Sequence, residues 1–479
     1  MFLELLLSAK IFYFLFSLLI GYVLFFYGKI ALERATGRRP PGPWGLPFIG
    51  SLLYMEKEFH RSLTKLGKQY GPIFCVELGS QKMVVLEKME QVREVFRQPN
   101  LNGRMPDVTG DTWMEAGFGL FFMPDDKRWR LNRKNALKAI SIFSTGKGRG
   151  LMDAVESVLG DFREELEAKN GQPIAPRHEL FSVTSALMLR LCFGLQLSLN
   201  DPEMRRTAAW VSDAMEDMNS TLIISMLPAL KPYYHAALAR QKEDVKRIGS
   251  YLGAMIRAHE FQGEVETIAD GLKKASAGMA AEELAEAGMS REELELVAVD
   301  LYAAGIFDTS EHIHWWLLLL AAHPDCQASV LKEIQAHDSA HRPTMRFAST
   351  LPISFPHATT ADFPLANWNI PKGTGIVANT WLIHHNPRVF PQPELYKPER
   401  FLADGVLDAK MVGEIFIFGA GGRRCIGEQF AKQMVFAFTL NLLKDYRVEL
   451  DPETPGNPLE HSFALTLQPG PHKLIFRKR

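Results

Sequence analysis

The stretch Phe-Gly-Ala-Gly-Gly-Arg-Arg-Cys-Ile-Gly at residues 418–427 constrains the fold more than any other part of this 479-residue sequence. It is a glycine-rich turn that leads into an amphipathic segment, 428–444, which we expect to be helical. Cys425 is therefore expected at a helix N-terminus, where backbone N–H groups and the helix dipole lower the pKa of a thiol. Gly421 and Gly427 allow a sharp turn and a close approach to a flat partner. Arg423 supplies a fixed positive charge that suits a carboxylate.

A metal or cofactor site at this turn has only one sulfur ligand to offer. Zinc and iron–sulfur sites need several soft ligands, whereas one thiolate beside a carboxylate-seeking arginine suits haem. The alternative is an ordinary buried cysteine next to a helix cap. The other cysteines, Cys75, Cys192 and Cys326, are far apart in the sequence. This spacing argues against a disulfide scaffold and fits a reducing compartment.

The same stretch resembles the haem-binding loop of the cytochrome P450 superfamily, Phe-x-x-Gly-x-Arg-x-Cys-x-Gly. Five positions match this pattern in order: Phe418, Gly421, Arg423, Cys425 and Gly427. The resemblance is greatest to the animal microsomal branch, which oxidises drugs, steroids and other lipophiles. It implies a mainly α fold with a small β portion and a bound haem b whose iron is ligated by Cys425. It also implies that Phe418 shields the sulfur and that Arg423 neutralises a haem propionate.

A basic segment, 127–140, reads as a helix on which Trp129 and Arg133, four residues apart, share a face. Trp-x-x-x-Arg is a signature of the P450 family, so the resemblance makes both residues partners of the haem propionates. It gives the same role to His357, whose alternative is surface solvation, and Arg104 falls where some members contact the haem. A neighbouring stripe on the same helix could receive an acidic electron-donor protein, the alternative being a solvated helix face: Arg130, Lys134 and Lys138.

A long helix is expected to begin at the capping box Ser290 to Glu293 and to end before Pro324, a length of roughly 50 Å. Its middle, residues 303–310, resembles the oxygen-activation motif of the P450 family. The resemblance implies that Thr309 holds water against bound oxygen and that Asp308 relays protons. One extra residue separates Gly305 from Asp308. Either Ile306 faces the haem, or the helix absorbs a bulge; the alternative reading is a threonine bonded to its own helix backbone.

One element of the family pattern is absent from the sequence. Family members carry a helix with Glu-x-x-Arg whose glutamate pairs that arginine with the arginine of a later Pro-Glu-Arg-Phe. Here Arg346 takes the place of the first arginine and Pro343 stands at the glutamate position. The later motif, with Arg400, is intact. We therefore expect two arginines that face each other without their carboxylate, because a loop and most of a helix are missing before Arg346.

The N-terminal segment predicts a membrane anchor. Residues 11–27 form an apolar run without charge, at the short end of the spanning range, and the basic residues that follow place the C-terminal side in the cytosol. A cleaved signal peptide is the alternative. We divide the chain into an anchor at 1–28, a basic and proline-rich hinge at 29–47 and a haem-thiolate catalytic domain at 48–479. The expected location is the endoplasmic reticulum membrane.

The resemblance implies a haem-dependent monooxygenase that inserts one atom of O2 into a lipophilic substrate, with electrons from NADPH–cytochrome P450 reductase. Cytochrome b5 is a further candidate partner. The net charge of −1 argues against nucleic-acid binding. Two alternatives remain at this point. The altered spacing before Asp308 favours a haem-thiolate protein without monooxygenase activity, and the absent glutamate favours a non-functional truncated variant.

Overall fold

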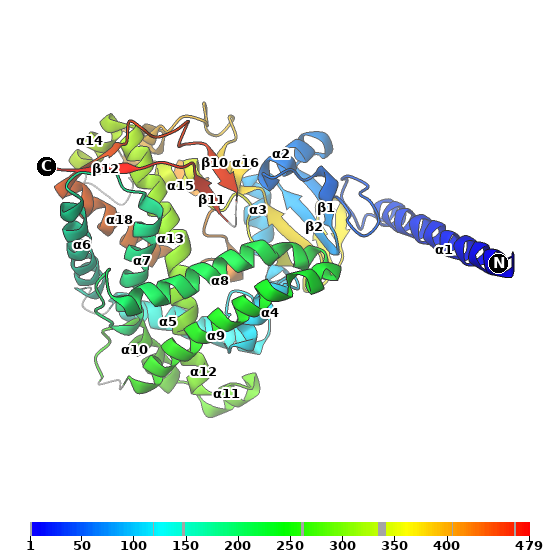
Figure 1. Cartoon of the computed structure of the whole chain (residues 1–479), viewed down its shortest axis with the longest axis horizontal. Coiled ribbons are helices and arrows are strands. Elements are labelled where there is room, and N and C mark those ends of the chain that lie inside the picture. Colours follow the sequence, from blue (N-terminus) through cyan, green and yellow to red (C-terminus); the bar gives the residue numbers. More distant parts are fainter. Residues whose placement is uncertain are drawn as a thin grey trace.

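The computed structural model describes residues 2–117, 119–145, 149–259, 263–333, 342–404, 406–463 and 466–479. A single long helix, α1 (Phe2–Ala35), projects from the body and carries the N-terminus away from it (Figure 1). Within residues 10–35 of this helix the most apolar 18-residue window has a mean hydropathy of 2.0, and none of that window is buried. The helix continues seven residues beyond residue 28, so the first part of the segment predicted as a hinge is helical.

The rest of the hinge is fixed to the body. The Arg39 guanidinium is buried and pairs with Glu33 at 3.4 Å and with Glu77 of strand β1 (Ile73–Leu78) at 2.8 Å. A Cβ on Gly42 would lie 1.9 Å from the carbonyl oxygen of Cys75, so only glycine fits there. The proline-rich spacer therefore lies directly against the first strand.

The main sheet has the strand order β1-β2-β6-β3, with β2 at Gln81–Leu86, β6 at Gly375–Ala378 and β3 at His357–Ala358. Alternating and turn residues in the sequence predict a hairpin at 73–86, a strand at 351–358, a C-terminal hairpin at 463–476 and a loop at 102–122. The hairpin β1–β2 confirms the first and turns at Gly79, whose φ is +60°. β2 and β6 are parallel, with Met83 opposite Gly375. The strand predicted over 351–358 is reduced to its last two residues, because prolines at 352 and 356 cannot donate to a ladder.

The remaining strands form two-stranded sheets. The C-terminal hairpin predicted over 463–476 is divided between two of them, since β10 pairs with β11 while β12 pairs with β9. The bounds are β4 (Phe363–Leu365) with β5 (Trp368–Ile370), β7 (Leu402–Ala403) with β8 (Val406–Leu407), β9 (Tyr446–Leu450) with β12 (Leu474–Lys478), and β10 (His461–Phe463) with β11 (Leu467–Pro469).

Helices make up most of the body, which confirms the predicted mainly α fold with a small β portion (Figure 1). Their bounds are α2 (Phe59–Tyr70), α3 (Met89–Phe96), α4 (Val108–Glu115), α5 (Lys127–Thr145), α6 (Arg149–Lys169), α7 (Pro176–Phe193), α8 (Pro202–Met226), α9 (His235–Ala258), α10 (Ile268–Ala277), α11 (Ala281–Ala287), α12 (Arg291–Glu295), α13 (Val297–Ala322), α14 (Pro324–Glu333), α15 (Arg342–Ala348), α16 (Thr380–His384), α17 (Ala409–Gly413) and α18 (Glu428–Asp445). Short 3-10 turns lie at η1 (Leu52–Tyr54), η2 (Pro99–Leu101), η3 (Pro228–Tyr234), η4 (Pro398–Phe401) and η5 (Gly421–Arg423).

Two helix predictions were wrong in detail. The capping box Ser290 to Glu293 is present, but it opens the short helix α12, and the chain turns at Leu296 before α13 begins. The uninterrupted helix is therefore 26 residues long, about 39 Å rather than 50 Å. The segment 102–122, predicted as a loop, contains α4.

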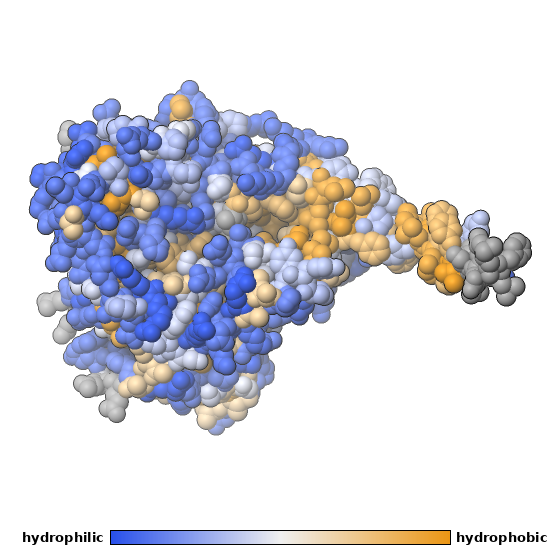
Figure 2. Space-filling model, in the orientation of Figure 1, coloured by the Kyte–Doolittle hydropathy of each residue, from blue (hydrophilic) through white to orange (hydrophobic). Residues whose placement is uncertain are grey.

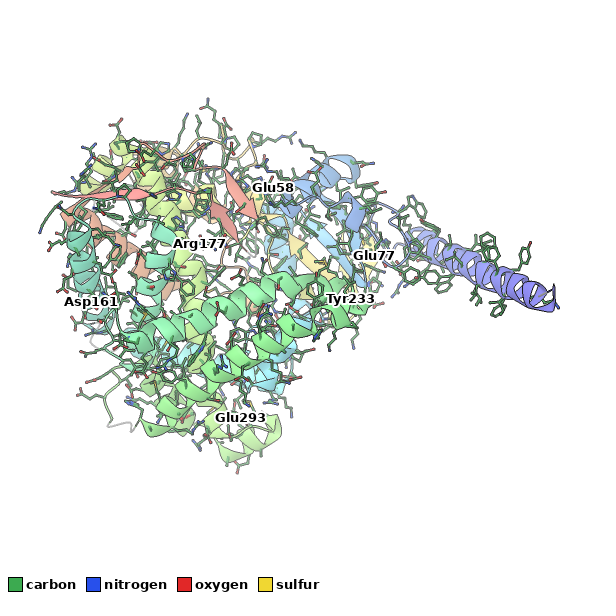
Figure 3. The ribbon with its side chains drawn as sticks, viewed as in Figure 1. Glu58, Glu77, Asp161, Arg177, Tyr233 and Glu293 are labelled. Atoms are coloured by element: carbon green, nitrogen blue, oxygen red, sulfur yellow. The ribbon has the colours of Figure 1, made fainter. Side chains whose placement is uncertain are left out.

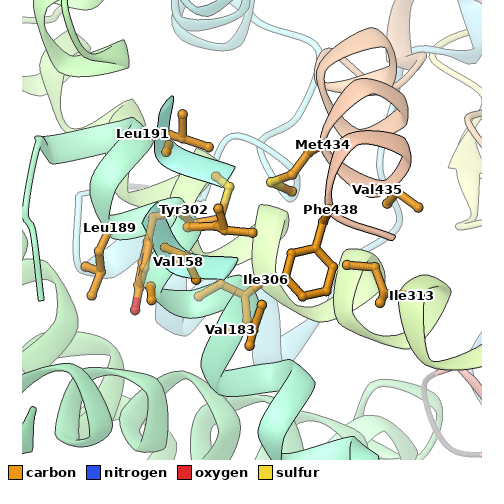
Figure 4. Packing of buried hydrophobic residues seen from close by; sticks show 14 of the residues in the cluster. Val158, Val183, Leu189, Leu191, Tyr302, Ile306, Ile313, Met434, Val435 and Phe438 are labelled. Carbon is orange, nitrogen blue, oxygen red and sulfur yellow. The ribbon is translucent and has the colours of Figure 1, made fainter. Parts of the chain in front are cut away.

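The core is organised around α13, which runs through the middle of the body beside α7 and α18 (Figure 1). Ile306 and Ile313 of α13 lie in one buried cluster with Val183 of α7 and Phe438 of α18 (Figure 4). Each of these side chains is fully removed from solvent. Such burial contributes about 1.5–3 kcal/mol per side chain to folding, and it fixes α13 relative to the turn that precedes α18.

Candidate active site

The turn that carries Cys425 has the tight geometry that its glycines predicted. The backbone N–H of Cys425 donates to the carbonyl of Phe418 at 2.8 Å, and the helix expected from residue 428 is α18. Gly421 has a φ of +67°, and a Cβ there would lie 1.9 Å from the carbonyl oxygen of Phe96. Gly427, the N-cap of α18, has no atom within 4 Å of its Cβ position. Packing against α3 thus requires the first glycine, whereas the second borders open space.

The pKa of Cys425 differs from the sequence prediction. Burial, together with the carboxylates of Asp308 and Glu428, raises it to about 11. The backbone N–H of Gly427 and the charge of Arg133 act in the predicted direction, but they are weaker than burial. The thiolate therefore needs a nearby cation, which a metal ion would supply because a metal deprotonates the thiol that coordinates it.

The middle of α13 has an exposed side near Cys425. Ala304 and Asp308, one turn apart, are exposed in a helix whose other central residues are mostly buried. Cys425 is also exposed, yet protein surrounds both Asp308 and Cys425 closely enough to raise their pKa values. Because the Asp308 carboxylate also raises the pKa of Cys425, the two groups border one interior space. Ala304 was not a predicted site residue, although its spacing of four from Asp308 could have identified it.

The helix absorbs its extra residue without a bulge. α13 is continuous α-helix, Ile306 is buried in the core rather than facing the open space, and Gly305 is pressed against α7. A Cβ on Gly305 would lie 2.4 Å from Cε of Met188. Ala304, one turn before Asp308, is therefore the small residue that stays exposed on this side of the helix.

The two predicted proton-handling residues have different surroundings. Burial, and then the carboxylate of Glu311, raise the pKa of Asp308 to about 6. Thr309 is buried, and within the described ranges its hydroxyl makes no hydrogen bond, whereas the neighbouring Ser310 hydroxyl donates back to the carbonyl of Phe307 at 2.9 Å. The alternative hypothesis, in which the Thr309 hydroxyl bonds to its own helix backbone, is therefore wrong.

Arg423 and Trp129 lie together, as the sequence suggested. The guanidinium of Arg423 stacks 3.7 Å from the centre of the Trp129 ring and donates to the carbonyls of Asn102 at 2.8 Å and Met123 at 2.6 Å. Its third nitrogen, Nη1, is buried without a hydrogen-bond partner. Burial, followed by the charge of Arg104, lowers the pKa of Arg423 to about 9. This arginine has a donor to spare, and the charges of Asp125 and Asp126, which act to raise its pKa, are outweighed by burial and by Arg104.

Three more basic residues gather around Arg423. Arg133 donates to the carbonyl of Arg424 at 2.5 Å, and Arg104 donates to the carbonyls of Phe121 and Pro356 at 2.9 and 3.2 Å. Nδ1 of the buried His357 lies 2.9 Å from the carbonyl of Leu101, and burial with the charge of Arg104 lowers the pKa of His357 to about 3.

Within the part of the chain that the structure describes, Arg104, Arg133 and Arg423 bond only to carbonyls and none bonds to a carboxylate. Arg104 and Arg133 both lower the pKa of Arg423. Such a cluster lacks counter-charge, and a ligand that carries two carboxylates supplies it. A haem has two propionates, so these residues, together with the Cys425 thiol, fit haem.

Phe418 lies beside the sulfur-bearing turn with Nζ of Lys432 4.9 Å from its ring centre. Lys432 and Arg424 both pair with the buried carboxylate of Glu428, Arg424 at 2.7 Å. The base of the Cys425 turn is thus held by two ion pairs to one buried carboxylate, which were not among the predicted features. The spacing of four residues between Arg424, Glu428 and Lys432 is the signal that could have found it.

The basic stripe on α5 is largely compensated. Two of its three cations form ion pairs, Arg130 with Asp125 at 2.9 Å and Lys134 with Glu283 at 2.6 Å, and two other cations of α5 do the same, Lys127 with Glu286 at 3.1 Å and Arg128 with Glu293 at 3.3 Å. Three of these partners come from α11 and α12. The stripe therefore offers less free positive charge to an acidic protein than its sequence suggested.

A second arginine cluster lies apart from the Cys425 turn. Arg346, buried in α15, donates to the carbonyls of His384 at 3.0 Å, Pro393 at 2.8 Å and Leu395 at 3.3 Å. Arg400 donates to the same Leu395 carbonyl at 3.1 Å. Burial and the charge of Arg400 lower the pKa of Arg346 to about 9, and Nε of Arg346 is buried without a partner. No carboxylate bonds either guanidinium among the described residues; the adjoining 334–341 lie outside them.

Known proteins resemble this chain over nearly its whole length. The family model of Cytochrome P450 matches residues 40–476. Cytochrome P450 1A1 from Mesocricetus auratus is 29% identical over 468 residues, covering 90% of this chain and 88% of that protein. Cytochrome P450 1A1 from Homo sapiens is 29% identical over 467 residues, covering 90% of each. A solved structure of a zebra fish cytochrome P450 with progesterone gives a TM-score of 0.75 at 25% identity, covering 87% of this chain and 99% of that one.

Proposed function

Because the chain belongs to the cytochrome P450 family, we propose that it inserts one oxygen atom from O2 into a lipophilic substrate with electrons from NADPH. Family membership makes it a haem b-dependent monooxygenase. The substrate class and the electron donor are the parts that we propose. One observation carries the assignment of the site: an unpaired thiol and a cluster of basic side chains without counter-charge lie around one space beside α13.

In this proposal Cys425 ligates the haem iron, Arg133 and Arg423 neutralise the propionates, and Trp129 and His357 are their neutral hydrogen-bond partners. When bound, the haem supplies the activation of O2 and the protein supplies orientation and proton delivery. Arg423 has a buried, unused donor for this purpose. His357 is neutral at pH 7, since its pKa is lowered to about 3, so it contributes a hydrogen bond rather than a charge. Gly421 shapes the turn, Gly427 leaves room beside it and Phe418 covers its edge.

Proton delivery is assigned to Asp308 and Thr309. A carboxyl whose pKa is about 6 changes its protonation close to neutral pH, as a proton relay requires. The Thr309 hydroxyl follows directly in the chain and is free of its own helix backbone. It can therefore hold a water molecule between Asp308 and the reacting oxygen.

The proposed substrate is a lipophilic small molecule, a xenobiotic, a steroid or a compound resembling a fatty acid. Solved structures similar to this chain are described with progesterone and with abiraterone, and the second has a TM-score of 0.73 at 25% identity. Both ligands are lipophilic. The exposed face of α13 includes the methyl group of Ala304, which suits an apolar substrate better than a charged one.

We place the protein on the endoplasmic reticulum membrane, anchored by α1, with its body in the cytosol. Figure 2 shows apolar side chains gathered on α1 and on the adjoining end of the body. Exposed apolar residues at that end are Leu46, Phe48, Leu53 and Tyr54. Tyr233 of η3, which is labelled in Figure 3, lies toward the same end and is 82% exposed. NADPH–cytochrome P450 reductase on the same membrane is the proposed electron donor, with cytochrome b5 as a second partner.

The test is the absorption spectrum of the reduced, CO-bound protein, followed by NADPH consumption with a lipophilic substrate. We expect the full-length protein to show the Soret band of a thiolate-ligated haem and Cys425→Ala to lose it entirely. Cys326→Ala, which alters a half-buried cysteine away from this turn, is the matched control and should keep the band. An unchanged band in Cys425→Ala would refute the assignment. NADPH consumption that needs neither substrate nor O2 would refute the proposed reaction.

A further inference from the structure

A second group of ligand-type side chains lies far from Cys425, where α2 meets the hairpin β10–β11. Glu58 caps α2, His60 lies in its first turn, and His461 comes from β10. Their ligand atoms all lie within 4.8 Å of one another. Figure 3 labels Glu58 between α2 and the red strands of the hairpin. The fold therefore brings His461 next to two side chains that lie about 400 residues earlier in the sequence.

His60 is the unusual member. It is fully buried, and both of its ring nitrogens lack a hydrogen-bond partner. Its neighbours are rings: Trp381 at 5.0 Å, His461 at 5.5 Å and Phe463 at 6.1 Å between centroids. A buried imidazole normally makes a hydrogen bond through at least one ring nitrogen. Two ring nitrogens without a partner therefore indicate a missing ligand.

The other two side chains also have unused capacity. Nε2 of His461 lies 3.5 Å from Oε1 of Glu58 and makes no hydrogen bond. Arg61 pairs with the other oxygen of Glu58, Oε2, at 2.9 Å. One carboxylate oxygen and one imidazole nitrogen thus remain directed at the region of His60.

An imidazole binds a metal ion through a ring nitrogen, and each of the two histidines has a buried ring nitrogen that makes no hydrogen bond.

We propose that Glu58, His60 and His461 bind one divalent transition-metal ion, for which zinc is the best match. Two imidazoles and one carboxylate form a common zinc ligand set that leaves a fourth position to water. Calcium and magnesium prefer oxygen ligands and fit this set poorly. The ligand atoms of a tetrahedral zinc lie roughly 3.3 Å apart, so the site must contract by about 1.5 Å at its widest. Glu58 lies outside the helical conformation and β10 has one partner strand, so both can move.

The ion has a structural role in this proposal. It ties the start of α2 to the hairpin β10–β11, two segments joined otherwise by apolar and ring contacts in this region. The bound ion should stabilise the folded protein in proportion to its concentration. This inference does not depend on the proposed reaction.

The test is zinc binding by the full-length, haem-loaded protein in detergent, without a histidine tag. After chelator treatment and dialysis against free Zn2+, elemental analysis should find one more zinc per chain in the parent than in His461→Ala. His178→Ala, which removes an exposed histidine, is the matched control and should bind as the parent does. Glu58→Gln should weaken binding at least tenfold. Zn2+ should also raise the unfolding temperature of the parent and not that of His461→Ala.

Equal zinc content in the parent and in His461→Ala would overturn the proposal. A rise in unfolding temperature that is the same in both proteins would overturn it as well. His461→Ala is chosen over His60→Ala because His461 lies in a short surface hairpin, whereas His60 is fully buried. The haem spectrum, recorded on the same samples, shows that each variant is folded and separates this result from any failure of the proposed function.

Discussion

Two arginine clusters in this molecule look alike and differ in where their counter-charge comes from. Around Cys425, Arg423 bonds two carbonyls, has one buried donor unused and lies near two more arginines. Around α15, Arg346 bonds three carbonyls, has one buried donor unused and shares the Leu395 carbonyl with Arg400. Burial and a neighbouring arginine lower the pKa of Arg423 to about 9, and they lower the pKa of Arg346 to about 9 as well.

The difference lies in what can supply the missing negative charge. In the proposed function a haem would bring two carboxylates to Arg423. Among the described residues no carboxylate bonds to Arg346, and Pro343 stands where family members have glutamate. Carbonyl oxygens accept the hydrogen bonds of a guanidinium but do not neutralise its charge. We therefore expect a binding site in the first cluster and a cost to stability in the second.

The largest expected effect is on haem retention. Arg423→Leu removes a charge-assisted hydrogen bond to a propionate, worth about 2 kcal/mol, so haem affinity should fall about 30-fold. Arg424→Leu, which removes the adjacent exposed arginine, is the matched control and should change affinity much less. Haem transfer to an acceptor protein measures both. Equal rates of haem loss in the two variants would mean that Arg423 is no propionate partner.

The second effect is on stability. Pro343→Glu puts a carboxylate three residues before Arg346 in α15, on the same side of the helix. An unpaired buried charge costs about 3–5 kcal/mol and the loss of a proline about 1 kcal/mol. We therefore expect the free energy of unfolding to rise by about 2 kcal/mol. Pro343→Gln is the uncharged control. If both variants unfold at the same temperature, the missing carboxylate is not what limits stability.

The smallest expected effect is on how the free energy of unfolding depends on pH. The folded protein keeps the Asp308 proton up to about pH 6, whereas the unfolded chain loses it near the ordinary carboxyl value. This residue therefore makes the protein less stable as pH rises from about 4 to 6. Asp308→Asn should remove that contribution. The free energy of unfolding of this variant, relative to that of the parent, should therefore increase as pH rises across the same range. Denaturation at several pH values measures it, and a constant difference between the two proteins would contradict the pKa.

Much of the site could be predicted because it rests on local spacing. The turn at Gly421, the helix after Cys425 and the pairing of Trp129 with the cationic cluster all follow from patterns within a few residues. The extent of α13 could not be predicted, since the turn at Leu296 interrupts a continuous helical pattern. The roles of Trp129, Arg133, His357, Phe418, Asp308 and Thr309 toward the haem stay predictions.

The sequence alone determined the family, the cysteine at the head of α18, the capping box and the β1–β2 hairpin. These depend on the conformational preferences and the order of neighbouring residues. Only the tertiary structure decided the raised pKa of Cys425, the carbonyl partners of Arg346 and the meeting of His60 with His461. Each of these depends on burial and on charges from segments far apart in the chain, and a local sequence pattern predicts neither.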